Sequence, residues 1–90
     1  MRRRAITVIG RVQGVGFRFY ASDCARRYSL TGWVRNTSEG SVAIEVQGPA
    51  LFIDSFIAEI REGPALARVR ELQVADVPLS NGEDGFEVRY

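Results

Sequence analysis

The sequence predicts an α+β fold in which two helices cover one face of an antiparallel sheet. Several short segments alternate apolar and polar residues, which is the pattern of half-buried strands. Two other segments carry apolar residues at intervals of three and four, which is the spacing of an amphipathic helix. At 90 residues the chain is long enough for one hydrophobic core, so we expect residues 1–90 to form a single domain.

The first half of the chain predicts a strand, a helix and a hairpin, in that order. Residues 5–12 alternate and predict the first strand. From Phe17 the apolar period lengthens, which predicts a helix that ends near Leu30. Residues 32–37 and 41–47 predict two further strands, and the short glycine-containing loop between them is typical of a hairpin.

The second half predicts one helix and two strands. Gly48-Pro49 begins the helix, because proline suits a first helical turn, and Gly63-Pro64 ends it. Residues 67–77 alternate but slip out of phase within residues 69–72, which predicts a β-bulge. The tail, residues 86–90, predicts a short strand. Its inward-facing residues are expected to be Phe86, Val88 and Tyr90.

The order of these elements is strand, helix, strand, strand, helix, strand, with a short strand added at the end. Both crossovers must be right-handed. Two such crossovers around a central hairpin produce the split βαβ or ferredoxin-like arrangement (βαββαβ), an alpha/beta sandwich in which the first and third strands pair and the second borders the third. Each helix has one apolar face, so both are expected on the same side of the sheet.

The composition excludes several classes of chemistry. The chain has no histidine and all 12 basic residues are arginine, which excludes histidine bases, Schiff-base lysines and the P-loop lysine. The aspartates are scattered and Cys24 is the only cysteine, which argues against a magnesium site, a cysteine-based metal site and a disulfide. We therefore expect no cofactor, no metal and no covalent intermediate. A net charge of +1 argues against nucleic acid as a partner.

The hydropathy of the chain argues against a membrane partner. No stretch approaches the roughly 20 apolar residues that a membrane span needs. Arginines at positions 2–4 resemble the start of a signal peptide, but Arg11 interrupts the apolar run that follows. We therefore expect a cytoplasmic protein. The three N-terminal arginines are expected to form a frayed, solvated terminus.

The segment GRVQGVGFRFY, residues 10–20, is the junction between the first strand and the first helix. It is either a tight turn with glycines in unusual backbone conformations or an anion cradle. In a cradle, successive N–H groups converge at the helix N-terminus, and Arg18 donates in parallel to the anion. The dinucleotide and P-loop fingerprints are absent. A partial match to the RNA-recognition motif fails at Gln13, Val15 and Arg18, and it lies on the wrong element.

The motif pair GRVQGVGFR (10–18) and GWVRN (32–36) resembles that of the acylphosphatases. GP at 48–49, GPALARV at 63–69 and the closing FEVRY fit as well, so the resemblance covers essentially the whole chain. It implies a small, metal-independent hydrolase that cleaves acyl phosphates to a carboxylate and inorganic phosphate. The same motifs also occur in a domain of hydrogenase-maturation carbamoyltransferases, so a binding or regulatory module stays open as the alternative.

The resemblance also implies roles for individual residues. The glycine-rich turn is then a phosphate-binding loop, Arg18 clamps the phosphate, and Asn36 positions the attacking water. The implied catalytic residues are thus Arg18 and Asn36. The implied substrate-binding residues are Val12, Gln13, Gly14, Val15, Gly16, Phe17 and Arg18. Because no zinc-finger cysteines or further domain follow FEVRY, we expect a free-standing enzyme that acts on a small-molecule acyl phosphate. We also expect it to be a monomer.

Overall fold

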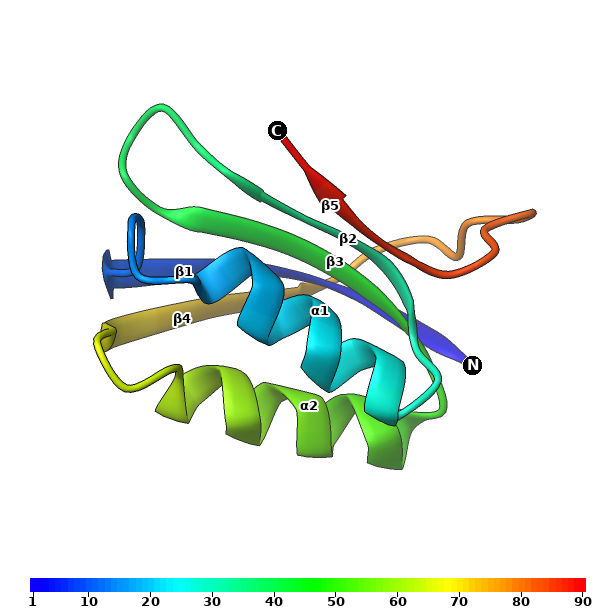
Figure 1. Ribbon diagram of the computed structural model, residues 1–90. Helices are drawn as coiled ribbons and strands as arrows, with labels where there is room; N and C mark the ends of the chain where they lie inside the picture. Colours follow the sequence, from blue (N-terminus) through cyan, green and yellow to red (C-terminus); the bar gives the residue numbers. More distant parts are fainter.

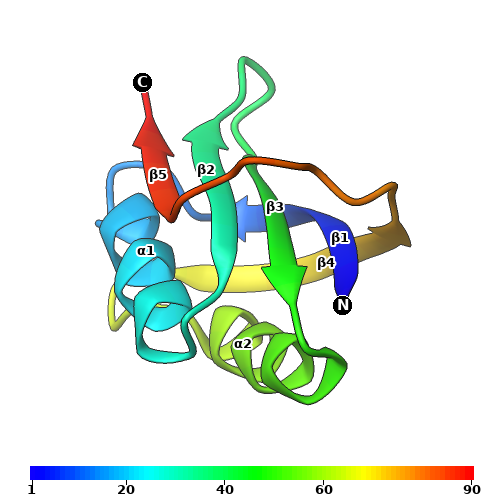
Figure 2. The same ribbon diagram turned by 90° about the vertical axis from the view of Figure 1, so that its right-hand side faces the viewer.

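The computed structural model describes all residues, 1–90, and confirms the ferredoxin-like fold. Five strands form one sheet in the order β4-β1-β3-β2-β5. Both helices cover the same face of this sheet (Figures 1 and 2). The elements are β1 (Arg2–Arg11), α1 (Phe17–Arg27), β2 (Thr31–Asn36), β3 (Val42–Gly48), α2 (Ala50–Glu62), β4 (Arg68–Asp76) and β5 (Phe86–Arg89).

The sheet is mixed rather than wholly antiparallel, which corrects one detail of the prediction. β1 pairs antiparallel with β3 and β4, and β2 pairs antiparallel with β3. β5, however, pairs parallel with β2. Residues 77–85 leave β4 at one edge of the sheet and cross to the opposite edge without running back along the strands. β5 therefore starts at the end where β4 stops, and it runs in the direction of β2.

The predicted bulge is confirmed in β4. Ile9 pairs with Glu71 but Gly10 pairs with Val69, so Arg70 is the extra residue. The core lies between the sheet and the helices, and Cys24 is buried in it. Burial raises the pKa of the Cys24 thiol to about 12, so this residue packs as a small hydrophobe rather than reacting as a nucleophile.

Two expectations about the chain ends are wrong. Tyr90 does not face inward, because β5 ends at Arg89 and the Tyr90 side chain beyond it is 90% exposed. The N-terminal arginines are not frayed, because they belong to β1, and Arg3 is only 5% exposed. The hydrophobic pattern could not reveal this, since the partners that bury Arg3 are polar and distant in the sequence.

Arg3 fixes the segment that crosses from β4 to β5. Its guanidinium donates to Glu45 Oε1 and to Glu83 Oε1, each at 2.8 Å, and to Gln47 Oε1 at 3.1 Å. Residues 77–85, which include Glu83, cross the sheet from β4 to β5 (Figure 2). The hydrogen bond from Arg3 holds the pKa of Glu83 below its ordinary value. The crossing segment thereby places β5 and the C-terminus beside α1.

Glu59 of α2 connects the two helices. Its ionisation is expected to make the stability of the protein depend on pH. Its carboxylate accepts hydrogen bonds from Arg27 Nη2 at 2.6 Å and from the Tyr28 hydroxyl at 2.5 Å. These donors, Arg27 first, lower the pKa of Glu59 from 4.5 to about 2. A carboxyl group with a lowered pKa stabilises the fold above its ordinary pKa, and that stabilisation is lost as the pH falls toward the folded-state value.

We therefore expect the free energy of unfolding to decrease as the pH is lowered from 4.5 to 2, with Glu59 as one contributor. Glu59→Gln should destabilise the protein at pH 7, but much less at pH 2, where the wild-type carboxylate is itself protonated. Urea denaturation at a series of pH values measures this difference. Glu39→Gln, in the exposed hairpin loop, is the control. Its free energy of unfolding should depend on pH as that of the wild type does. If the free energy of unfolding had the same dependence on pH in wild type and Glu59→Gln, the Glu59 carboxylate would not titrate in this range.

Candidate active site

The turn between β1 and α1 has a backbone that requires glycine. Gly14 and Gly16 have φ angles of +74° and +77°, in the left-handed region that other residues avoid. A Cβ at either position would meet nothing within 4 Å, so the requirement is conformational rather than spatial. Gly16 is the N-cap of α1, no side chain caps this helix, and no acidic residue lies in its first turn. The helix N-terminus is therefore open.

The backbone N–H groups of the turn have no main-chain partners. None of the N–H groups from Gln13 to Arg18 donates to a carbonyl oxygen within the protein. The N–H groups of a first helical turn cannot bond within the helix, and the helix dipole makes their surroundings favourable for an anion. A bound anion would satisfy several of these donors at once. The turn thus has the properties of an anion cradle.

Asn36, the last residue of β2, faces the turn across a cavity of about 120 Å³. Since a water molecule takes up about 30 Å³, the cavity holds about four water-sized groups, which is the scale of one phosphoryl group. At this end of the hairpin the side-chain hydrogen bonds join Thr37 and Ser41. The side-chain amide of Asn36 takes no part in them. The lining residues are Val12, Gly14, Gly16, Phe17, Arg18, Phe19 and Asn36, none of them acidic.

Most of the expected site residues therefore lie together, and two do not reach the cavity. Val15 packs against the hydrophobic core, and the side chain of Gln13 faces the hairpin. Only the backbone N–H groups of these two residues are available to a ligand. Phe19 lines the cavity but was not among the expected residues. In the sequence Phe19 is a large aromatic residue off the apolar face of the helix, which is the signal that could identify it, and in the structure it is 59% exposed.

Gln13 connects the turn to the hairpin that carries Asn36. Its Nε2 donates to the carbonyl oxygens of Thr37 at 2.8 Å and of Ser41 at 2.9 Å. Thr37 and Ser41 also join their hydroxyl groups at 2.6 Å, which closes the hairpin loop directly after Asn36. Gln13 therefore fixes the distance between the cradle and the Asn36 amide, two groups that come from different strands.

Arg18 lies in the first turn of α1 and is held in place by the C-terminus. Its Nη1 donates to the carbonyl oxygen of Arg89 at 3.2 Å, and its guanidinium carbon lies 4.6 Å from the centroid of the Tyr90 ring. A guanidinium over a ring face at this distance is a cation–π interaction. One hydrogen bond uses one of the five N–H donors of the guanidinium, so the others can bind a ligand.

Anion binding is the chemistry that these donors offer. The cradle supplies backbone N–H groups, Arg18 supplies a cation, and Asn36 supplies a neutral amide with both a donor and an acceptor. Nowhere in the protein do three or more His, Cys, Asp or Glu residues group closely enough to hold a metal ion. None of the helices has the length and apolar character to cross a membrane.

Known proteins resemble this chain along its entire length. A model of the acylphosphatase family matches residues 4–88. An acylphosphatase of Clostridium acetobutylicum is 41% identical over 90 residues, which cover 100% of this chain and 99% of the relative. The crystal structure of acylphosphatase from Bacillus subtilis, 34% identical, superposes with a TM-score of 0.96 and covers 100% of both chains. A part amounting to 12% of full-length HypF, in a phosphate- and nucleotide-bound form, covers 99% of this chain at 35% identity and a TM-score of 0.87.

Proposed function

The chain belongs to the acylphosphatase family, and we propose that the turn at residues 12–18 and Asn36 carry out the hydrolysis of acyl phosphates. The products are a carboxylate and inorganic phosphate. One observation supports the site assignment above all. A run of N–H groups without main-chain partners at an open helix N-terminus faces the free Asn36 amide across a cavity of phosphoryl size.

The cradle and Arg18 bind the phosphoryl group. Its oxygens accept hydrogen bonds from the backbone N–H groups between Gln13 and Arg18, and from the parallel N–H donors of the Arg18 guanidinium. These donors are fixed before the substrate arrives, by the glycine conformations of the turn and by the contacts of Arg18 with Arg89 and Tyr90. Fixed donors stabilise the charge of the transition state without reorganising, which is the main source of catalysis in phosphoryl transfer.

Asn36 positions the attacking water. Its amide oxygen accepts one hydrogen of the water, which directs a lone pair of the water oxygen at phosphorus. The new O–P bond forms while the bond between phosphorus and the acyl oxygen breaks, and the carboxylate leaves with the electron pair. The second proton of the water passes to a phosphoryl oxygen, so no side-chain base is needed. The site offers none, in agreement with this route.

The absence of a general acid predicts the substrate class. A carboxylate leaving group has a pKa near 4 and needs no proton, whereas an alkoxide does. No residue that lines the cavity is an acid at neutral pH. The site is therefore suited to acyl phosphates and unsuited to phosphate esters of alcohols.

The direct test of the function is the loss of benzoyl phosphate absorbance in the presence of the purified protein. We expect acyl phosphates to be hydrolysed at least about 10²-fold faster than glycerol phosphate, whose leaving group is an alkoxide, the scale of a missing general acid. Activity should survive excess chelator, and inorganic phosphate should inhibit competitively. Comparable rates on acyl phosphates and glycerol phosphate would reveal an acid in the site, and a magnesium requirement would overturn the metal-free mechanism. Phosphate binding without turnover would identify the turn as a binding module, the alternative class.

We further propose that residues 1–90 act as one domain and as a monomer in the cytoplasm, without a nucleic-acid partner. One continuous core cluster of 17 residues supports the single domain. Every group of the proposed site comes from the same chain, so catalysis needs no second copy. The single free cysteine agrees with a reducing compartment. Size-exclusion chromatography with light scattering tests the oligomeric state.

A further inference from the structure

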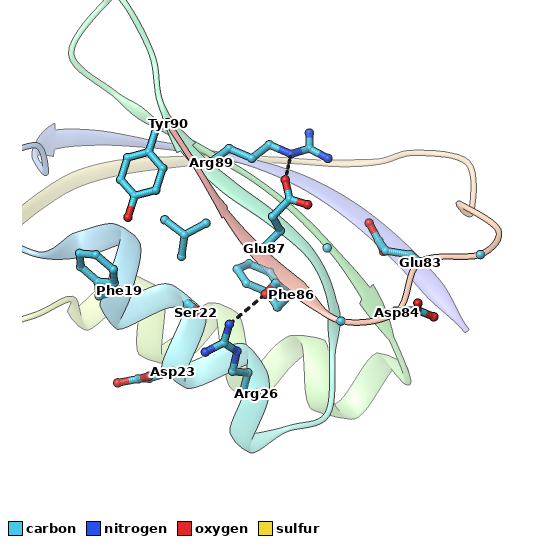
Figure 3. Close-up of a pocket in the computed structure, with 14 residues that line it drawn as sticks. Phe19, Ser22, Asp23, Arg26, Glu83, Asp84, Phe86, Glu87, Arg89 and Tyr90 are labelled. Atoms are coloured by element: carbon cyan, nitrogen blue, oxygen red, sulfur yellow. Dashed lines mark hydrogen bonds and ion pairs between the residues drawn. The ribbon is translucent and has the colours of Figure 1, made fainter.

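A groove of about 780 Å³ lies between the outer side of α1 and β5 (Figure 3). Phe19, Ser22, Asp23 and Arg26 form its wall on α1. Residues 82–90 form most of the opposite wall. The steps of hydrolysis derived above take place in the smaller cavity and assign no role to this groove.

The groove and the phosphate cavity share a wall. Phe19 lines both of them. Arg89 and Tyr90 line the groove, and these are the residues that hold the Arg18 guanidinium, through the 3.2 Å hydrogen bond and the 4.6 Å ring contact. A phosphoryl group bound by Arg18 would therefore lie directly beside one end of the groove.

The sizes of the cavity and the groove suit different parts of a substrate. The cavity of about 120 Å³ matches a phosphoryl group in size. The groove, at about 780 Å³, lies within the range of roughly 300–1,000 Å³ that is usual for small-molecule sites. The acyl part of a bound substrate extends beyond the phosphoryl group, and the groove is the neighbouring space that shares Phe19 with the cavity. An acetyl group would fill only a small part of this space.

The end of the groove beside the cavity is aromatic. Phe19 is 59% exposed and Tyr90 is 90% exposed, although large aromatic side chains usually bury most of their surface. In Figure 3 the two rings lie opposite each other at the same end of the groove. Exposed rings of this kind attract a third ring, which can pack against them in an offset or edge-to-face arrangement.

The charged groups of the groove disfavour an anionic acyl group. Arg89 is paired with Glu87 at 2.8 Å, and Arg26 donates to the carbonyl oxygen of Phe86 at 3.3 Å. The carboxylates of Asp23 and Asp84 also line the groove, and no cation of the protein is paired with them. The groove therefore has aromatic residues at the end beside the cavity and a surplus of negative charge.

We propose that this groove binds the acyl group of the substrate and selects uncharged aromatic acyl phosphates, with the aromatic ring packed between Phe19 and Tyr90. This inference rests on the hydrolase function proposed above. The phosphoryl group then occupies the cradle while the ring lies outside it, and the scissile bond spans the boundary between the two spaces. Phe19 is a specificity-determining residue in this arrangement.

The test compares kcat/KM for benzoyl phosphate and acetyl phosphate in four proteins: wild type, Phe19→Ala, Phe19→Tyr and Phe52→Ala. The ratio of the two values should fall about tenfold in Phe19→Ala, the scale of one lost apolar or aromatic contact. It should be kept in Phe19→Tyr. Phe52, an aromatic residue of α2 that is 48% exposed and outside the groove, provides the matched control and should leave the ratio unchanged. Intrinsic differences in substrate reactivity cancel when variant and wild-type ratios are compared.

A second measurement does not depend on the alanine variant. Benzoate should inhibit acetyl phosphate hydrolysis by the wild type at about tenfold lower concentration than acetate does. Equal losses on both substrates in Phe19→Ala, or equal inhibition by the two carboxylates, would overturn the groove proposal and leave the hydrolase function intact. Failure of the wild type to hydrolyse either acyl phosphate would instead overturn the function, and the groove proposal with it.

Discussion

Arg18→Ala is expected to weaken the binding of inorganic phosphate and to lower kcat at the same time, so that kcat/KM for benzoyl phosphate falls about 10³-fold. The guanidinium touches phosphoryl oxygens in both the ground state and the transition state, and therefore both parameters change. Steady-state kinetics with benzoyl phosphate, together with the inhibition constant of phosphate, measure the two effects separately. Far-ultraviolet circular dichroism should stay native, because the Arg18 side chain lies outside the core cluster.

Two further variants sharpen this prediction. Arg18→Lys should recover only part of the loss, because an ammonium group cannot donate two parallel hydrogen bonds. Nor can it keep both the Arg89 carbonyl and the Tyr90 ring as the guanidinium does. Arg61→Ala, which removes an arginine from the last turn of α2, is the matched control and should retain wild-type kinetics. A folded Arg18→Ala protein with kcat and phosphate affinity within a few-fold of wild type would rule out the clamp.

The elements of the fold could be predicted because each is encoded locally. The apolar period of three to four from Phe17 onward identifies α1, and the slip in alternation identifies the bulge at Arg70. The direction of β5 could not be predicted in the same way. It depends on where residues 77–85 cross the sheet, and that course is fixed by the bond between Arg3 and Glu83, which lie 80 residues apart. No periodicity reports a contact of this kind.

The candidate site likewise contains a part that is encoded locally and a part that depends on distant contacts. The glycine turn and Arg18 are contiguous in the sequence, so their physical chemistry alone suggests an anion cradle, with a simple tight turn as the alternative. Asn36 was assigned only through a family resemblance, because its distance from the turn depends on the pairing of β1, β3 and β2 and on the hydrogen bonds of Gln13. The contact of Arg18 with Tyr90 was missed, since the closing strand was expected to turn Tyr90 inward. Tyr90 is instead 90% exposed, and its ring lies against the Arg18 guanidinium.

Asn36→Ala should separate the catalytic step from phosphate binding. We expect kcat to fall about 10²-fold or more, the usual scale for the loss of one positioned polar group, while the inhibition constant of phosphate changes little. The reason is that the amide contacts the attacking water and not the phosphoryl oxygens. Its position across the cavity from the cradle, without a hydrogen bond to the hairpin, suits this role. The measurement is kcat for benzoyl phosphate with phosphate inhibition determined in parallel.

The remaining asparagine supplies the control for this variant. Asn81 lies exposed in the segment between β4 and β5, and Asn81→Ala should leave both kcat and phosphate affinity at wild-type values. Asn36→Asp adds a second contrast, because a carboxylate at this position would face the bound phosphoryl group and repel it. It should therefore raise the inhibition constant of phosphate, which Asn36→Ala should not do. If Asn36→Ala folds and keeps near-normal kcat, the water is positioned by another group and Asn36 only terminates β2.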